Sequence, residues 1–153
     1  MNAYVNQYQQ TQVTTASPER ILIMLYDGAI RFLGQARNCI ESGERLPKRE
    51  ALSRAIAIVS YLSDTLDHQA GWEHAEELDA LYAFMVRELT KVNLTDDLKA
   101  LEVVEGLLKE LRATWAEAID IVREQKCQAT PHPFAAATEV GKPADYRPLS
   151  IAL

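Results

Sequence analysis

Apolar side chains recur every three or four residues along most of this chain, and that spacing places them on one side of a helix. The second such stretch shows the pattern most clearly, with Leu52, Ala55, Ile56, Val59, Leu62 and Leu66 in series. None of the first 125 residues shows the alternating pattern of a β-strand. Four amphipathic helices with short connections pack as an antiparallel up-down-up-down bundle, so we predict an all-α fold.

The start and the end of the first helix are marked by local signals. Ser17 is suited to accept a hydrogen bond from an N–H of the first turn, and Pro18 at the first helical position has no N–H to leave unpaired. Gly43 favours the left-handed conformation that ends a helix. We therefore expect this helix to end near Ser42.

The second helix is expected to begin at Pro47 and to end near residues 68–70, with Gly71 as the break. The periodic pattern then resumes, and it predicts a third helix over about residues 73–91.

A short polar segment separates the third helix from the fourth. Asn93 and Leu94 are expected to form the connection, and Thr95 is expected to be the N-cap of the fourth helix. Asp96 and Asp97 would then lie in the first turn, where carboxylates are favoured.

The composition divides the chain into three parts. Residues 1–16 are polar and rich in Gln and Thr, which predicts an irregular N-terminal arm. Residues 17–125 carry the helical pattern and form the expected bundle. Residues 126–153 are interrupted by four prolines and predict a flexible C-terminal tail.

The overall balance of charge argues against some classes of partner. The formal net charge is −6, whereas phosphate binding needs a basic surface, so nucleic acid is not expected as a partner. The longest apolar run, from Ile21 to Leu25, is far too short to insert into a membrane. The first residues show no basic region followed by an apolar stretch, so we do not expect a secretory signal there, and Cys39 and Cys127 are isolated. Together these features predict a cytosolic protein with reduced thiols.

The first helix has more apolar surface than one stripe needs. Leu22, Leu25, Ala29, Leu33, Ala36 and Ile40 supply a core stripe, yet Ile21, Ile23, Met24, Tyr26, Ile30 and Phe32 lie outside it. A helix that is apolar nearly all round must be covered on more than one side. Three kinds of cover would satisfy this requirement: the other helices around a central position in the bundle, the protein's own arm or tail, or another chain.

No arrangement of residues in the sequence indicates catalysis, a metal or another cofactor. Di-iron bundles need two Glu-x-x-His pairs, and no glutamate stands three residues before any of the three histidines. The two cysteines have no neighbours at zinc-ligand spacing. We therefore expect a protein-binding function and not an enzyme.

Several segments in order resemble the flagellar secretion chaperone FliS family. They include Thr15-Ala16-Ser17-Pro18-Glu19-Arg20-Ile21, Met24-Leu25-Tyr26-Asp27-Gly28-Ala29, Leu81-Tyr82-Ala83-Phe84-Met85 and Glu105-Gly106-Leu107-Leu108. Tyr8-Gln9-Gln10 is similar to the N-terminal arm of the family. The similarity covers about residues 4 to 122.

The resemblance implies a cytosolic export chaperone that binds the disordered C-terminal segment of flagellin and prevents premature polymerisation. It also implies delivery to the flagellar type III export gate, and an arm that lies over the groove while no flagellin is bound. An anti-sigma factor is a further partner that the resemblance leaves open.

The alternative to a flagellin chaperone is a structural or regulatory bundle that only self-associates, with the broad apolar face as a homodimer interface. From the apolar face and the resemblance together, we expect partner contacts at Tyr8, Ile21, Met24, Leu25, Phe32, Ile58, Leu62, Leu81, Tyr82 and Met85.

Overall fold

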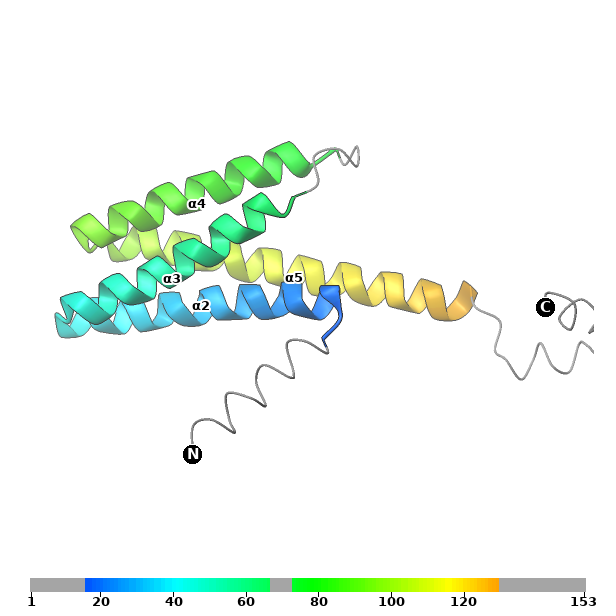
Figure 1. The fold of residues 1–153 in the computed structure, drawn as a ribbon, viewed down its shortest axis with the longest axis horizontal. Helices are drawn as coiled ribbons and strands as arrows, with labels where there is room; N and C mark the ends of the chain where they lie inside the picture. Colours follow the sequence, from blue (N-terminus) through cyan, green and yellow to red (C-terminus); the bar gives the residue numbers. More distant parts are fainter. Residues whose placement is uncertain (1–15, 67–72, 130–153) are drawn as a thin grey trace, which may run out of the picture. The chain divides into compact units, whose positions relative to one another are not determined.

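A computed structural model describes residues 16–66 and 73–129, and this part of the chain is helical. The helices are α2 (Pro18–Ser42), α3 (Arg45–Asp64), α4 (Ala75–Thr95) and α5 (Leu98–Ala129). Each helix runs antiparallel to the one before it, and α3 packs against α2 on one side and α4 on the other (Figure 1). The predicted all-α, up-down-up-down bundle is confirmed.

The core draws side chains from all four helices. The largest fully buried ones are Tyr26, Leu33, Leu52, Tyr82, Met85, Leu89, Leu101 and Leu108. The described residues up to Ala116 form one compact unit, and residues 117–129 belong to a second. The bundle core therefore lies in the first unit, and the candidate site is built there.

Both ends of α2 form as the sequence predicts. The Ser17 hydroxyl accepts a hydrogen bond from the Arg20 N–H over 3.3 Å, and Pro18 is the first helical residue. Gly43 adopts φ 77°, a left-handed conformation that costs glycine little, and its N–H bonds to the last turn of the helix.

The predicted limits of α3 are wrong by a few residues. The helix begins at Arg45, so Pro47 lies within its first turn, where a missing N–H also costs nothing. It ends at Asp64, short of the expected residues 68–70, and Thr65 follows as its C-cap. The expected break at Gly71 lies outside the described residues.

The structure corrects the predicted junction between α4 and α5. Asn93 and Leu94 are helical, and Thr95 is the last residue of α4 and not a cap of α5, because its hydroxyl donates to a carbonyl one turn back. Asp96 makes the turn with φ 55°. Asp97 is the cap of α5, since its carboxylate accepts from the N–H groups two and three residues later.

Helix α5 continues to Ala129, so the first four residues of the expected tail are helical. The arm, residues 1–15, and the rest of the tail, residues 130–153, lie outside the described ranges. Among the helices that the structure describes, none combines the length and the hydropathy of a membrane span.

Candidate functional site

Three of the residues expected to contact a partner are parts of the core. Leu62, Tyr82 and Met85 are 3%, 2% and 0% exposed. The amphipathic pattern alone did not separate them from surface positions, because a core stripe and a binding stripe have the same spacing. In this conformation they present no surface, and we leave them out of the proposed site.

The other predicted residues keep part of their surface. Ile21, Leu25, Phe32, Ile58 and Leu81 are half-buried. Met24 is exposed, and Tyr8 lies outside the described residues.

Three half-buried side chains of α2 form one line. Ile21, Leu25 and Phe32, with the buried Gly28 between the last two, follow at three- or four-residue intervals, about a quarter turn away from the core stripe of the same helix. Met24 lies at the edge of this line. Leu25 and Phe32 pack against the edge of the core and keep part of their surface exposed.

Helix α3 contributes a matching line. The methyl end of Ile58 would lie 3.3 Å from a Cβ added at Gly28, so the two helices approach closely at that level. Arg54 lies over the Phe32 ring. Tyr61, one turn beyond Ile58, is 54% exposed and was not among the residues predicted for the site.

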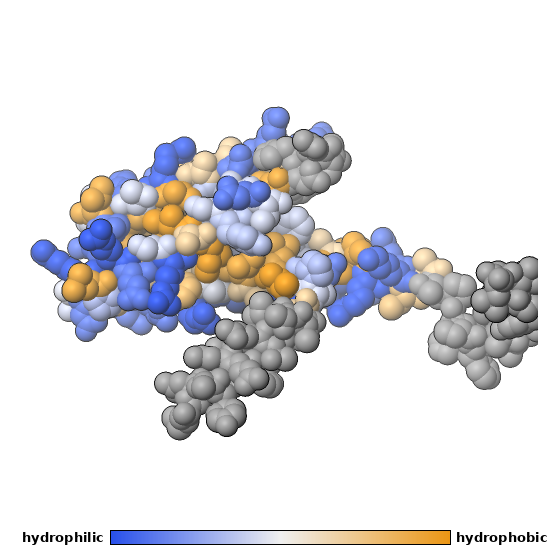
Figure 2. Space-filling model, viewed as in Figure 1, coloured by the Kyte–Doolittle hydropathy of each residue, from blue (hydrophilic) through white to orange (hydrophobic). Residues whose placement is uncertain are grey.

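We call this surface the α2–α3 seam; it comprises Ile21, Met24, Leu25, Phe32, Ile58 and Tyr61. Hydrophobic side chains gather on the face of the molecule over the middle of these two helices (Figure 2). The signal for Tyr61 was present in the sequence, because Arg54, Ile58 and Tyr61 continue at helical spacing on α3. Ile58 of this line was among the predicted contacts, and Tyr61 was noted outside the main stripe of its helix but was not included among them.

The seam ends in a groove of about 300 Å³ near the turn between the two helices. We call it the Phe32 groove; its lining residues are Phe32, Gln35, Cys39, Pro47, Glu50, Ala51 and Arg54. The guanidinium carbons of Arg31 and Arg54 lie 5.3 and 5.6 Å from the centre of the Phe32 ring. Both distances suit a cation–π contact.

A buried polar cluster holds α2 in place behind the seam. The hydroxyls of Tyr26 and Tyr82 form a hydrogen bond, and the Trp115 indole N–H donates to the Tyr26 oxygen over 3.1 Å. Burial raises the pKa of both tyrosines above the usual value of about 10. The cluster therefore joins α2, α4 and α5 through neutral hydroxyl groups.

Ion pairs also connect α2 to α5. Arg112 binds both carboxylate oxygens of Asp27, over 2.7 and 3.3 Å. Arg37 pairs with Glu105, which is only 7% exposed and also lies 3.0 Å from the Lys109 amine. These pairs take up polar groups of α2 that face away from the seam.

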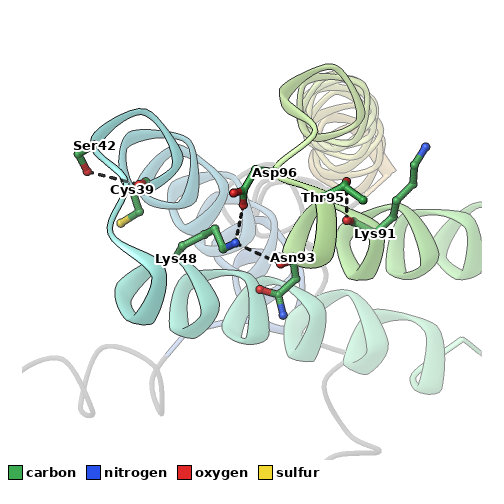
Figure 3. Close-up of polar contacts among 7 residues, drawn as sticks. All are labelled: Cys39, Ser42, Lys48, Lys91, Asn93, Thr95 and Asp96. Carbon is green, nitrogen blue, oxygen red and sulfur yellow. Dashed lines mark hydrogen bonds and ion pairs between the residues drawn. The ribbon is translucent and has the colours of Figure 1, made fainter.

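Lys48, which follows the groove residue Pro47 in the first turn of α3, is 7% exposed (Figure 3). Its ammonium group donates to the Asn93 carbonyl over 3.1 Å and pairs with Asp96. A cation is favoured there, because the carbonyls at the end of α4 carry partial negative charge. The contact ties the first turn of α3 to the last turn of α4.

Within residues 16–66 and 73–129, no three His, Cys, Asp or Glu side chains gather closely enough to hold a metal ion. The seam instead offers apolar side chains with a charged margin at one end. This combination defines the class: a helical bundle with a surface suited to binding another polypeptide.

Comparison with known proteins identifies the family. The model of the family "Flagellar protein FliS" matches residues 1–122. The flagellar secretion chaperone FliS of Salmonella typhimurium is 40% identical over 118 residues, which cover 76% of this chain and 87% of that protein. The Bacillus subtilis FliS is 34% identical over 119 residues, covering 78% and 88%. The chain belongs to the FliS family, a family of chaperones and not of enzymes.

A solved structure, described as a flagellar chaperone from bacteria, has the same fold. It superposes with a TM-score of 0.63 at 16% identity and covers 76% of this chain and 97% of its own. At that identity the likeness supports the bundle fold alone.

Proposed function

We propose that this protein is a cytosolic export chaperone that binds the disordered C-terminal segment of flagellin along the α2–α3 seam. Bound in this way, the segment is kept from polymerising and is held for delivery to the flagellar type III export gate. The observation that carries the proposal is a row of apolar side chains on a folded bundle, half-exposed where the core is already complete, in a member of a secretion chaperone family.

The energetics of such binding favour reversible holding. Covering on the order of 1,000 Å² of apolar surface contributes roughly 25 kcal/mol, at about 25 cal/mol per Å². Ordering a disordered segment costs about 1–2 kcal/mol per residue in backbone entropy. Most of the gain is therefore cancelled, which leaves a complex that still dissociates when the client is handed on.

Size-exclusion chromatography with light scattering tests the proposal. The full chain is mixed with full-length flagellin and, separately, with flagellin that lacks its C-terminal segment. We expect a stable complex with the first and none with the second, and we expect the first mixture to resist polymerisation. An obligate homodimer that ignores both flagellins would instead favour the self-associating alternative.

A further inference from the structure

The Phe32 groove differs chemically from the rest of the seam. Phe32 and Ala51 make part of its lining apolar, whereas Gln35, Glu50 and Arg54 give it a polar margin. Its volume of about 300 Å³ is at the small end of binding pockets, so it suits one large side chain and not an extended segment.

The charged side chains of the lining, Glu50 and Arg54, balance each other, and Arg31, which contacts Phe32 from outside the lining, adds a positive charge beside the groove. Arg54 pairs with Glu50 over 2.6 Å, and both side chains are more than half exposed. Arg31 forms none of the ion pairs among the described residues and instead lies over the Phe32 ring. Around the Phe32 ring there are therefore two guanidinium groups, from Arg31 and Arg54, and one carboxylate, from Glu50.

We propose that the Phe32 groove is a specificity site for an apolar client side chain that has a carboxylate residue, Asp or Glu, directly beside it in the chain. The apolar side chain covers Phe32 and Ala51. The carboxylate pairs with Arg31 and Arg54, because guanidinium groups bind carboxylates through paired, charge-assisted hydrogen bonds. This inference rests on the proposed function, since it names what the seam selects in its client.

The small size of the groove favours a client peptide over a second copy of this chain. A stable dimer interface buries about 800 Å² on each partner, far more than a one-side-chain groove supplies. A peptide that lies along the seam fills the groove as one contact of many, so the groove contributes selectivity and the seam contributes most of the affinity.

Cys39 provides a direct reporter of groove occupancy. Its half-buried side chain lines the groove, whereas Cys127 is exposed on the last turns of α5. In a Cys127→Ser background, the rate of modification by a thiol reagent then measures access to the groove alone. An occupant of the groove should slow this reaction at least about ten-fold at saturation.

The test uses two synthetic 20-residue peptides of Ala, Leu and Gln with one central Phe, followed by Glu in one peptide and by Gln in the other. We expect the Glu peptide to bind roughly three- to ten-fold more tightly, consistent with one exposed charged contact. We also expect it to protect Cys39. High salt should remove the difference between the peptides, because the pairing is exposed.

Variants assign the selectivity to the groove. In Arg31→Gln/Arg54→Gln the two peptides should bind equally. In Arg45→Gln/Arg49→Gln the preference should remain, because this control removes the same charge from exposed positions of α3 that do not line the groove. All four side chains are exposed, so the fold, checked by circular dichroism, should be unchanged.

The proposal is overturned if the peptides bind equally to the wild-type chain, if neither binds, or if Cys39 stays reactive in the complex. Cys39 protection that rises with protein concentration without peptide would identify a second copy as the occupant and would also overturn it. A flagellin C-terminal segment is measured in parallel. If it binds while Cys39 remains open, only this inference fails; if it does not bind, the proposed function fails independently.

Discussion

The hydroxyl groups of Tyr26 and Tyr82 are buried among apolar side chains, and they satisfy each other. Removing one hydroxyl leaves the other without that partner, whereas removing both leaves no tyrosine hydroxyl without it. Tyr26→Phe also removes the oxygen that accepts from the Trp115 indole N–H, in the single and the double variant alike. We expect Tyr26→Phe to cost about 2 kcal/mol of unfolding free energy, and the double variant with Tyr82→Phe to cost less than the sum of the single changes. Urea denaturation of the wild type, the two single variants and the double variant measures this double-mutant cycle.

Tyr61 supplies the control for this cycle, because its ring is exposed and no hydrogen bond of its hydroxyl is found in the described structure. Tyr61→Phe should change the unfolding free energy by less than about 0.5 kcal/mol. Additive effects of the Tyr26 and Tyr82 changes would mean that the two hydroxyls do not depend on each other.

The same pair predicts how stability changes at high pH. Burial raises the pKa of both hydroxyls in the folded chain, so the unfolded chain loses these protons first. The stability they provide is complete below about pH 10 and is lost as pH rises toward the higher folded pKa values. Between pH 10 and 11, the wild type should lose roughly 1 kcal/mol more than the Tyr26→Phe/Tyr82→Phe variant.

Thermal melts of both proteins at pH 9, 10 and 11 measure this difference. Lysine titration affects both proteins equally, so it cancels in the comparison. Parallel losses in the two proteins would show that the buried hydroxyls do not set the alkaline limit of the fold.

At the scale of single residues, the sequence pattern identified the apolar stripes but did not show which apolar side chains are buried and which remain at the surface. Ile21 and Leu25 keep exposed surface, whereas Met85, which is also apolar, is fully buried. The difference arises from the angle between each position and the neighbouring helix, which depends on how the helices pack. The groove beside Phe32 likewise forms from two helices and has no signal in either one alone.

At the scale of the helices, the junction between α4 and α5 offers the sharpest test. Asp97 caps α5 with its carboxylate, while the hydroxyl of Thr95 bonds back within α4. Asp97→Ala should therefore destabilise the protein by about 1 kcal/mol, the usual loss for an N-cap. Thr95→Ala should be close to neutral, because that back-bond adds little to a helix.

Chemical denaturation of the two variants side by side distinguishes the alternatives. A larger loss of stability for Thr95→Ala than for Asp97→Ala would indicate that Thr95 is the N-cap of α5, as the sequence pattern predicted, and would contradict the observed junction.

Helix ends were predictable where one residue has a single low-energy role. Gly43 is such a residue, since its left-handed backbone ends α2 as expected. Pro47 is not, because proline is tolerated anywhere in the first turn and so marks the start of α3 only to within two residues. Thr95 and Asp97 are both good caps, and only the backbone path decides between them.

At the scale of the whole molecule, the fold was predictable because four long apolar stripes with short connections allow few other arrangements. The surplus of apolar residues in the first helix was also visible in the sequence. Its cover was not, because a partner-binding line and a core line share the same period. In the structure, one of these extra apolar residues, Tyr26, is part of the core. Ile21, Met24 and Phe32 keep exposed surface and belong to the α2–α3 seam.

The central claim is that the α2–α3 seam binds the client, and a pair of matched variants addresses it. Met24→Asp/Tyr61→Asp introduces two charges at exposed positions of the seam. Ile121→Asp/Val122→Asp makes the same chemical change at two positions of α5 that are each 48% exposed and do not belong to the seam.

Isothermal titration calorimetry of a flagellin C-terminal segment into these proteins is the most direct test. For the wild type we predict submicromolar affinity and a negative heat-capacity change, because apolar surface is buried. The seam variant should bind at least about 30-fold more weakly, since it loses roughly 2 kcal/mol of apolar contact, and the α5 variant should stay within about three-fold of wild type. Unchanged affinity in the seam variant, or an equal loss in the α5 variant, would contradict the assignment of the seam.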